Sequence, residues 1–112
     1  MENAVILITN NGMGNADVQL QQILIAKYLE LLSQNGEMPA AICFYTEGVR
    51  LVCEGSPVLD QLRALEANRV RLLVCSTCLN YFNLANNVRV GIVGGMGDIL
   101  EAQTKAEKVI TL

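Results

Sequence analysis

Short, continuous apolar runs alternate with longer amphipathic segments along this chain. The first run, Ala4 to Thr9, is rich in β-branched residues, which favours a strand buried on both faces of a parallel sheet. Comparable runs predict four further strands, at residues 40–46, 70–75, 88–93 and 109–112. Polar segments that contain glycine or asparagine follow most of these runs, as expected where a buried strand ends.

A long amphipathic helix is predicted after the first strand. It should span residues 17–35, and Gly36 then stands where a left-handed cap is easiest to form. Its apolar positions form an arc wider than one sheet contact requires, and comprise Leu20, Leu24, Tyr28 and Leu31, extended by Val18, Ile25, Leu29 and Leu32. The apolar positions beyond those needed for the sheet contact predict that some apolar surface is buried against other copies of the chain.

Shorter helices complete the pattern. Ser56 and Pro57 are typical of an N-cap followed by proline at the first helical position, which predicts a helix that ends near Ala67. A short helix or turn should follow the third strand, and another helix the fourth. Strands that alternate with helices indicate a single α/β domain over residues 1–112, with a five-stranded, mostly parallel sheet flanked by helices.

Composition and charge narrow the function. Among the 112 residues, 52% are hydrophobic, and eleven acidic residues outnumber eight scattered basic ones, for a net charge of −3. Without a basic stripe, no nucleic-acid partner is expected. No apolar stretch reaches the ~20 residues that span a bilayer, and the N-terminus lacks the basic region of a signal peptide. We therefore expect a cytoplasmic protein with no membrane partner, whose thiols stay reduced.

The chemistry of the chain centres on Cys75 and Cys78. Cys75 ends the third predicted strand, at the edge of the sheet where ligands gather, and a following helix would stabilise its thiolate. Cys78 lies one helical turn later on the same face. It could form a disulfide with Cys75 or receive sulfur from it as a persulfide. The alternative is that Cys75 packs like a small hydrophobic residue and that Cys78 has no role.

A zinc site competes with this interpretation. A structural zinc site usually needs four ligands, and the chain has one C-x-x-C and no histidine. Cys43 and Cys53 could complete a ligand set only if a buried strand and an unrelated loop met the pair. We therefore expect no metal.

The loop after the first strand contains Gly12 and Gly14, but Asp17 stands where the dinucleotide fingerprint has its third glycine. A tight turn that caps the helix is favoured over a nucleotide site, although backbone N–H groups there could hold a small anion. No cofactor is expected.

Charged residues in other loops could line a pocket at the same edge of the sheet. Glu47 and Asp98 both follow strands, and Arg50 could hold an anion or a thiolate, although a solvated charge or a helix cap explains each equally simply. The candidate pocket residues are Gly12, Gly14, Glu47, Arg50, Ser76, Thr77, Met96 and Asp98.

Three stretches form a pattern together: Phe44–Val49, the strand that ends in Cys75, and the segment from Gly94 to Ile110. Their order and spacing resemble the DsrE-like family along essentially the whole chain. Residues 75–79 and 48–51 are most similar to the DsrE-like domain of YedF-type proteins, which are associated with selenium or sulfur metabolism. The family pattern there has Gly where Ser76 stands and Asn where Thr46 stands.

The resemblance implies a flavodoxin-like α/β fold that assembles into homo- or hetero-oligomers. It also implies that Cys75 carries sulfur, or selenium, as a persulfide, with Cys78 as its partner thiol. Sulfur-donor and sulfur-acceptor proteins, such as a TusA-like carrier, would then be its partners. A non-catalytic oligomeric binding module and a dithiol redox switch remain as alternatives.

Overall fold

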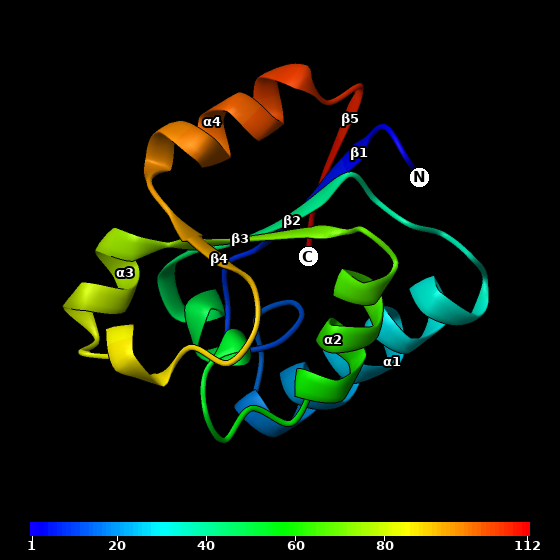
Figure 1. Cartoon of the computed structure of the whole chain (residues 1–112). Helices are drawn as coiled ribbons and strands as arrows, with labels where there is room; N and C mark the ends of the chain where they lie inside the picture. Colours follow the sequence, from blue (N-terminus) through cyan, green and yellow to red (C-terminus); the bar gives the residue numbers. More distant parts are fainter.

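A computed structural model describes the whole chain, from Met1 to Leu112. Five strands form one sheet in the order β4-β3-β2-β1-β5, and every neighbouring pair is parallel (Figure 1). The strands are β1 (Ala4–Ile8), β2 (Ala41–Phe44), β3 (Arg71–Cys75), β4 (Ile92–Gly94) and β5 (Lys108–Thr111). The α/β fold and the five strands are confirmed, and the sheet is wholly rather than mostly parallel.

Helices cover both faces of this sheet. The α-helices are α1 (Val18–Gln34), α2 (Leu59–Ala67), α3 (Ser76–Tyr81) and α4 (Met96–Lys105), and the 3₁₀ helices are η1 (Thr46–Val52) and η2 (Ala85–Asn87). Helices α1 and α2 lie on one face and α4 on the other (Figure 1). Right-handed crossovers explain the division, because α4 connects strands in the opposite direction across the sheet from α1 and α2.

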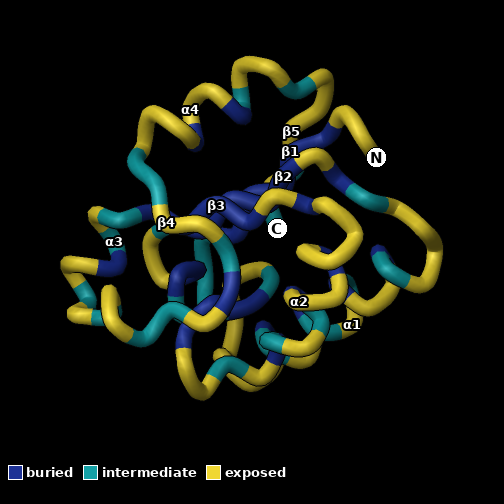
Figure 2. The backbone as a smooth tube through the Cα atoms, in the orientation of Figure 1, coloured by how far each residue is buried: buried dark blue, intermediate teal, exposed yellow.

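The core lies mainly between the sheet and the α1–α2 layer. Every residue of β1 and β2 is buried, and so are the last four of β3, which accounts for the continuous apolar runs in the sequence (Figure 2). The inward residues of the two helices are Ile25, Leu29, Leu32, Leu62 and Leu65.

Helix α1 agrees closely with its predicted boundaries. The Asp17 carboxylate accepts a 2.9 Å hydrogen bond from the Gln19 N–H at the N-terminus, and Gly36 follows the helix with a φ of +66°. Only part of the predicted apolar arc is buried. An exposed apolar row remains on the outer side of α1, and it consists of Leu20, Ile23, Leu24 and Leu31.

The predicted start of α2 is wrong by a few residues. The helix begins at Leu59 with Val58 at the N-cap, and the Ser56 hydroxyl accepts a 3.2 Å hydrogen bond from the Val58 N–H in the turn before it. Ser56 therefore stabilises the approach to the helix, and Pro57 belongs to that turn rather than to the first helical position.

The fourth strand is shorter than predicted. Val88 pairs antiparallel with Cys53 outside the sheet, and the Arg89 N–H donates to the Val52 carbonyl at 2.8 Å. Gly91 then turns the chain with a φ of +87°, so that the sheet strand begins only at Ile92. The second strand is also shorter, because it ends at Phe44 and leads into η1. None of the helices is long and apolar enough to cross a membrane.

Candidate functional site

The two neighbouring cysteines lie where β3 meets α3. Cys75 is the last residue of β3 and pairs in register with Gly94 of β4, so it stands at the carboxyl edge of the sheet. Its side chain is nevertheless only 1% exposed. The strand-end position agrees with the sequence, but the thiol is buried there, because this part of the edge is covered.

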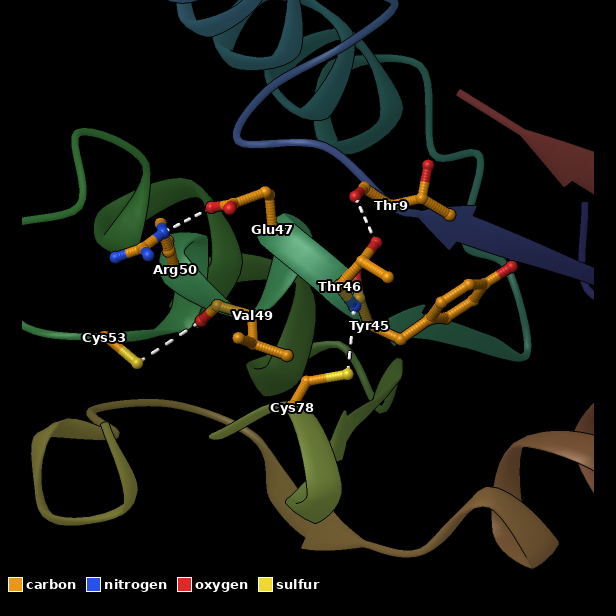
Figure 3. A network of polar contacts seen from close by, with 8 residues as sticks. All are labelled: Thr9, Tyr45, Thr46, Glu47, Val49, Arg50, Cys53 and Cys78. Carbon is orange, nitrogen blue, oxygen red and sulfur yellow. Dashed lines mark hydrogen bonds and ion pairs between the residues drawn. The ribbon is translucent and has the colours of Figure 1, made fainter. Parts of the chain in front are cut away.

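Cys78 differs from Cys75 in both exposure and contacts. It is partly exposed, and its sulfur accepts a hydrogen bond of 3.1 Å from the backbone N–H of Thr46 (Figure 3). Thr46 is the exposed first residue of η1 and lies 32 positions earlier in the chain. A peptide N–H directed at sulfur favours the charged thiolate over the neutral thiol. Cys78 is therefore the more accessible member of the pair and has a donor aimed at it.

The conformation of Thr46 is what directs this N–H. Its φ of +48° lies in the left-handed region, which a β-branched residue rarely adopts. The Thr46 hydroxyl lies 2.5 Å from the Thr9 carbonyl oxygen and 2.7 Å from that of Tyr45, and it can donate its proton to either (Figure 3). These contacts with the ends of β1 and β2 offset the unfavourable backbone angle.

Burial raises the pKa of the Cys78 thiol above its ordinary value. The Thr46 N–H acts in the opposite direction and lowers it, whereas the neighbouring Cys75 thiol raises it further. Cys75 is the N-cap of α3 and Cys78 lies one helical turn later, so the two thiols are neighbours. At neutral pH Cys78 is mainly a protonated thiol whose ionisation Thr46 assists.

Arg50 is held by η1 and α3 together. Its guanidinium pairs with the Glu47 carboxylate, three residues earlier (Figure 3). It also lies 4.4 Å from the centre of the Phe82 ring. Phe82 is the C-cap of α3, so this cation–π contact joins η1 to the helix that carries Cys78. Glu47 and Arg50 therefore neutralise each other's charge. Through Phe82, Arg50 also links η1, which begins at Thr46, to α3, which carries Cys78.

Gly12 and Gly14 stabilise the start of α1. A Cβ on Gly12 would collide with the backbone of Gln21, and the Gly14 carbonyl accepts a 2.6 Å hydrogen bond from the Asn10 side chain. The Met13 N–H donates to the Gln21 carbonyl at 2.9 Å. These contacts favour the tight-turn interpretation of the loop, and none of them reaches the cysteine pair.

The other candidate pocket residues fall into two places. Ser76 and Thr77 form the first turn of α3, beside the cysteines. Met96 and Asp98 begin α4, where the Asp98 carboxylate accepts a 2.9 Å hydrogen bond from the Gly95 N–H and so acts as a helix cap. Asp98 also lines a groove of about 220 Å³ that neither Cys75 nor Cys78 lines. Asp98 is the one member of the predicted set that lines this groove.

The remaining cysteines do not join the pair. Cys43 is buried within β2, and the Cys53 thiol donates a 3.3 Å hydrogen bond to the Val49 carbonyl (Figure 3). Burial raises the pKa of Cys43 to about 11 against a smaller lowering by Arg71, and it also raises the pKa of Cys53. No three cysteine, aspartate or glutamate side chains gather in a way that could hold a metal ion.

Sequence reasoning missed Thr9, Thr46 and Phe82 as parts of this site. The carbonyl of Thr9 and the N–H of Thr46 are backbone groups, which leave no residue-specific signal. One indication of the unusual backbone of Thr46 was present in the sequence. The family pattern that this segment resembles has Asn where Thr46 stands, and Asn adopts positive φ more readily than Thr. The contact of Phe82 with Arg50 had no sequence signal, because it depends on how η1 and α3 pack.

Comparisons with known proteins cover almost the entire chain. The model of the DsrE/DsrF-like family matches residues 3–112, whereas no curated protein matches the sequence significantly. The fold is similar to a protein of unknown function, MTH1491 from Methanobacterium thermoautotrophicum, with a TM-score of 0.71, 20% identity and 97% of each chain covered.

Two further solved structures share the fold. The ychN protein from E. coli has a TM-score of 0.70 and 16% identity, over 97% of this chain and 98% of that one. BT1422, a conserved protein of unknown function from Bacteroides thetaiotaomicron, has a TM-score of 0.70 and 16% identity, over 98% and 95%.

Proposed function

The chain belongs to the DsrE/DsrF-like family, and from this membership and its adjacent thiols we propose that it is a sulfur carrier that holds a sulfane sulfur atom as a persulfide. Cys75 is the proposed resting position of the sulfur, and Cys78 is its partner thiol. The observation that supports the proposal most directly is the pair itself: two free thiols, one helical turn apart at the carboxyl edge of the sheet, one of them partly exposed.

The proposed reaction is thiol–persulfide exchange. A thiolate of the pair attacks the outer sulfur of a donor persulfide, so that a new S–S bond forms while the donor's S–S bond breaks and the donor leaves as a thiolate. Delivery to an acceptor thiol is the same step in reverse. Neither step needs an oxidant, a reductant or a metal, because the sulfane sulfur keeps its oxidation state throughout.

The partners belong to the same proposal. A donor and an acceptor that present a persulfide or a thiol, such as a TusA-like carrier, would exchange sulfur with the pair. The exposed apolar row of α1 supports association with further copies of this chain. The likeness to YedF-type domains extends the proposed cargo to selenium, which undergoes the same exchange at a thiolate.

Intact-mass analysis tests this function. Reduced protein is incubated with a small-molecule persulfide, alkylated and weighed, with the double variant Cys75→Ser/Cys78→Ser as the control. A gain of one sulfur atom in the wild type and none in the double variant is expected. If the wild type gains no sulfur but loses two hydrogen atoms reversibly, the pair is a redox switch instead. If it gains nothing and both thiols resist alkylation, the binding-module alternative replaces the carrier.

A further inference from the structure

We propose that Cys78, rather than Cys75, is the thiol that first accepts the sulfur atom from the donor, and that Cys75 receives it from Cys78 in a second, internal step. This inference rests on the proposed carrier function and gives it an order. It also makes Thr46 a positioning residue, whose peptide N–H holds the Cys78 sulfur for attack.

Access is the first argument. Sulfur exchange requires three sulfur atoms nearly in line, so the attacking thiol must meet the donor at the protein surface. Cys75 is 1% exposed and cannot meet a donor without a local opening of the structure. Cys78 is partly exposed, and Thr46 and Thr77 beside it are exposed as well, so a donor reaches its sulfur directly.

The hydrogen bond at Cys78 is the second argument. The Thr46 N–H lies 3.1 Å from the Cys78 sulfur and favours the thiolate that attacks. The same N–H stabilises this sulfur when it leaves as a thiolate in the next transfer. Thr46 has a left-handed backbone conformation, which is unfavourable for a threonine. Its hydroxyl contacts with the carbonyl oxygens of Thr9 and Tyr45 maintain this conformation at the position where its N–H faces the Cys78 sulfur.

The internal step follows from the proximity of the two thiols. The Cys75 thiol gives up its proton and attacks the outer sulfur of the Cys78 persulfide, which forms a bond from Cys75 to that sulfur and breaks the bond to Cys78. The Cys78 sulfur leaves as a thiolate and takes up a proton, so charge and oxidation state are unchanged. The sulfur then rests on a buried residue, shielded from water and from small thiols in solution.

The experiment separates this order from the carrier function. Wild-type protein is mixed with glutathione persulfide, quenched by alkylation at increasing times, digested without reduction, and mapped by mass spectrometry to locate the added sulfur. We expect the sulfur on Cys78 at the earliest times and on Cys75 later. Sulfur on Cys75 from the first time point would overturn the order but leave the carrier function intact, whereas no sulfur on either residue overturns both.

Single variants provide an independent readout. Cys75→Ala should still gain one sulfur atom, which stays on Cys78 because the internal step is lost. Cys78→Ser should load at least about tenfold more slowly, since exposing the buried Cys75 then costs a local opening of ~1.4 kcal/mol or more. Equal loading of the two single variants contradicts the proposal. The same two variants in denaturing urea should load at similar rates, which shows that the difference arises from the fold.

Discussion

The backbone N–H of Thr46 and the sulfur of Cys78 lie 3.1 Å apart across 32 positions of sequence. This hydrogen bond joins the start of the connection between β2 and α2 to α3, the helix that follows β3. Because adjacent parallel strands β2 and β3 end at the same edge, the residues that follow them meet there. The arrangement directs a peptide dipole at a thiol without using a charged side chain.

Replacing the Thr46 hydroxyl tests how that dipole is held. Thr46→Val keeps the shape of the side chain but loses the bonds to the Thr9 and Tyr45 carbonyl oxygens. We expect a loss of about 1 kcal/mol in the free energy of unfolding and an upward shift of the Cys78 pKa, since the N–H is no longer held against the sulfur. Thr46→Ser is the matched control and should resemble the wild type.

The measurement is the pH dependence of Cys78 alkylation, made in a Cys43→Ala/Cys53→Ala/Cys75→Ala background so that one thiol reacts. The midpoint should lie at higher pH in Thr46→Val than in Thr46→Ser. Identical midpoints would show that the hydroxyl does not position the N–H.

The contact between Arg50 and Phe82 predicts a second effect. Arg50→Met removes both the cation–π contact and the ion pair with Glu47, and should lower the free energy of unfolding by about 1 kcal/mol, since both interactions are partly exposed. Urea unfolding measures this loss. In a double-mutant cycle, Phe82→Leu should cost less in the Arg50→Met background than in the wild type. Additive losses would show that the two side chains do not interact.

The buried thiol of Cys43 predicts a loss of stability at high pH. Burial raises its pKa from 9.0 to about 11 in the folded protein. Below pH 9 the thiol is protonated in both states. Between pH 9 and 11 only the unfolded state releases the proton, so the free energy of unfolding should fall by roughly 2 to 3 kcal/mol across this window.

Urea unfolding under reducing conditions at pH 8 and pH 11 measures this change. Cys53, Cys78 and Tyr28 also have raised pKa values and add to the fall. The matched variant Cys43→Ala isolates one contribution, because it should show a smaller drop between the two pH values than the wild type. An equal drop in both proteins would contradict the assignment.

Gly48 should tolerate no side chain. A Cβ at this position would collide with the Ile8 carbonyl at the end of β1. Gly48→Ala should therefore destabilise the fold by about 3 kcal/mol or more, which a lower urea midpoint would reveal. Gly97→Ala is the control, because the residue is within α4 and no atom beyond its chain neighbours and the nearby backbone of that helix lies within 4 Å of the added carbon. That change should be neutral or stabilising.

The exposed apolar row of α1 predicts self-association. Leu24 and Leu31 are 40% and 52% exposed on the isolated chain. If copies of the chain bury this row, the double variant Leu24→Arg/Leu31→Arg should shift the particle mass toward that of one chain, as measured by light scattering after gel filtration. The same substitutions at the exposed polar positions Gln19 and Gln34 should leave the mass unchanged. A wild-type protein that is already monomeric would contradict this prediction.

The sequence by itself determined the layers of this protein. Continuous β-branched runs specify strands buried on both faces, and the alternation with helices specifies a parallel sheet. Asp17 and Gly36 located the ends of α1, because caps depend on one residue and its immediate neighbours. The position of Cys75 at the end of β3 followed from the same local pattern.

Tertiary structure alone decided what surrounds the cysteines. The burial of Cys75, the hydrogen bond from Thr46 to Cys78 and the place of Arg50 over Phe82 each join segments that are distant in sequence. The early end of β2 and the late start of β4 have the same origin, since residues 46–53 and 88–89 pair with other parts of the chain. Local patterns record which face a residue prefers, but the exposure and ionisation of a thiol depend on every segment packed around it.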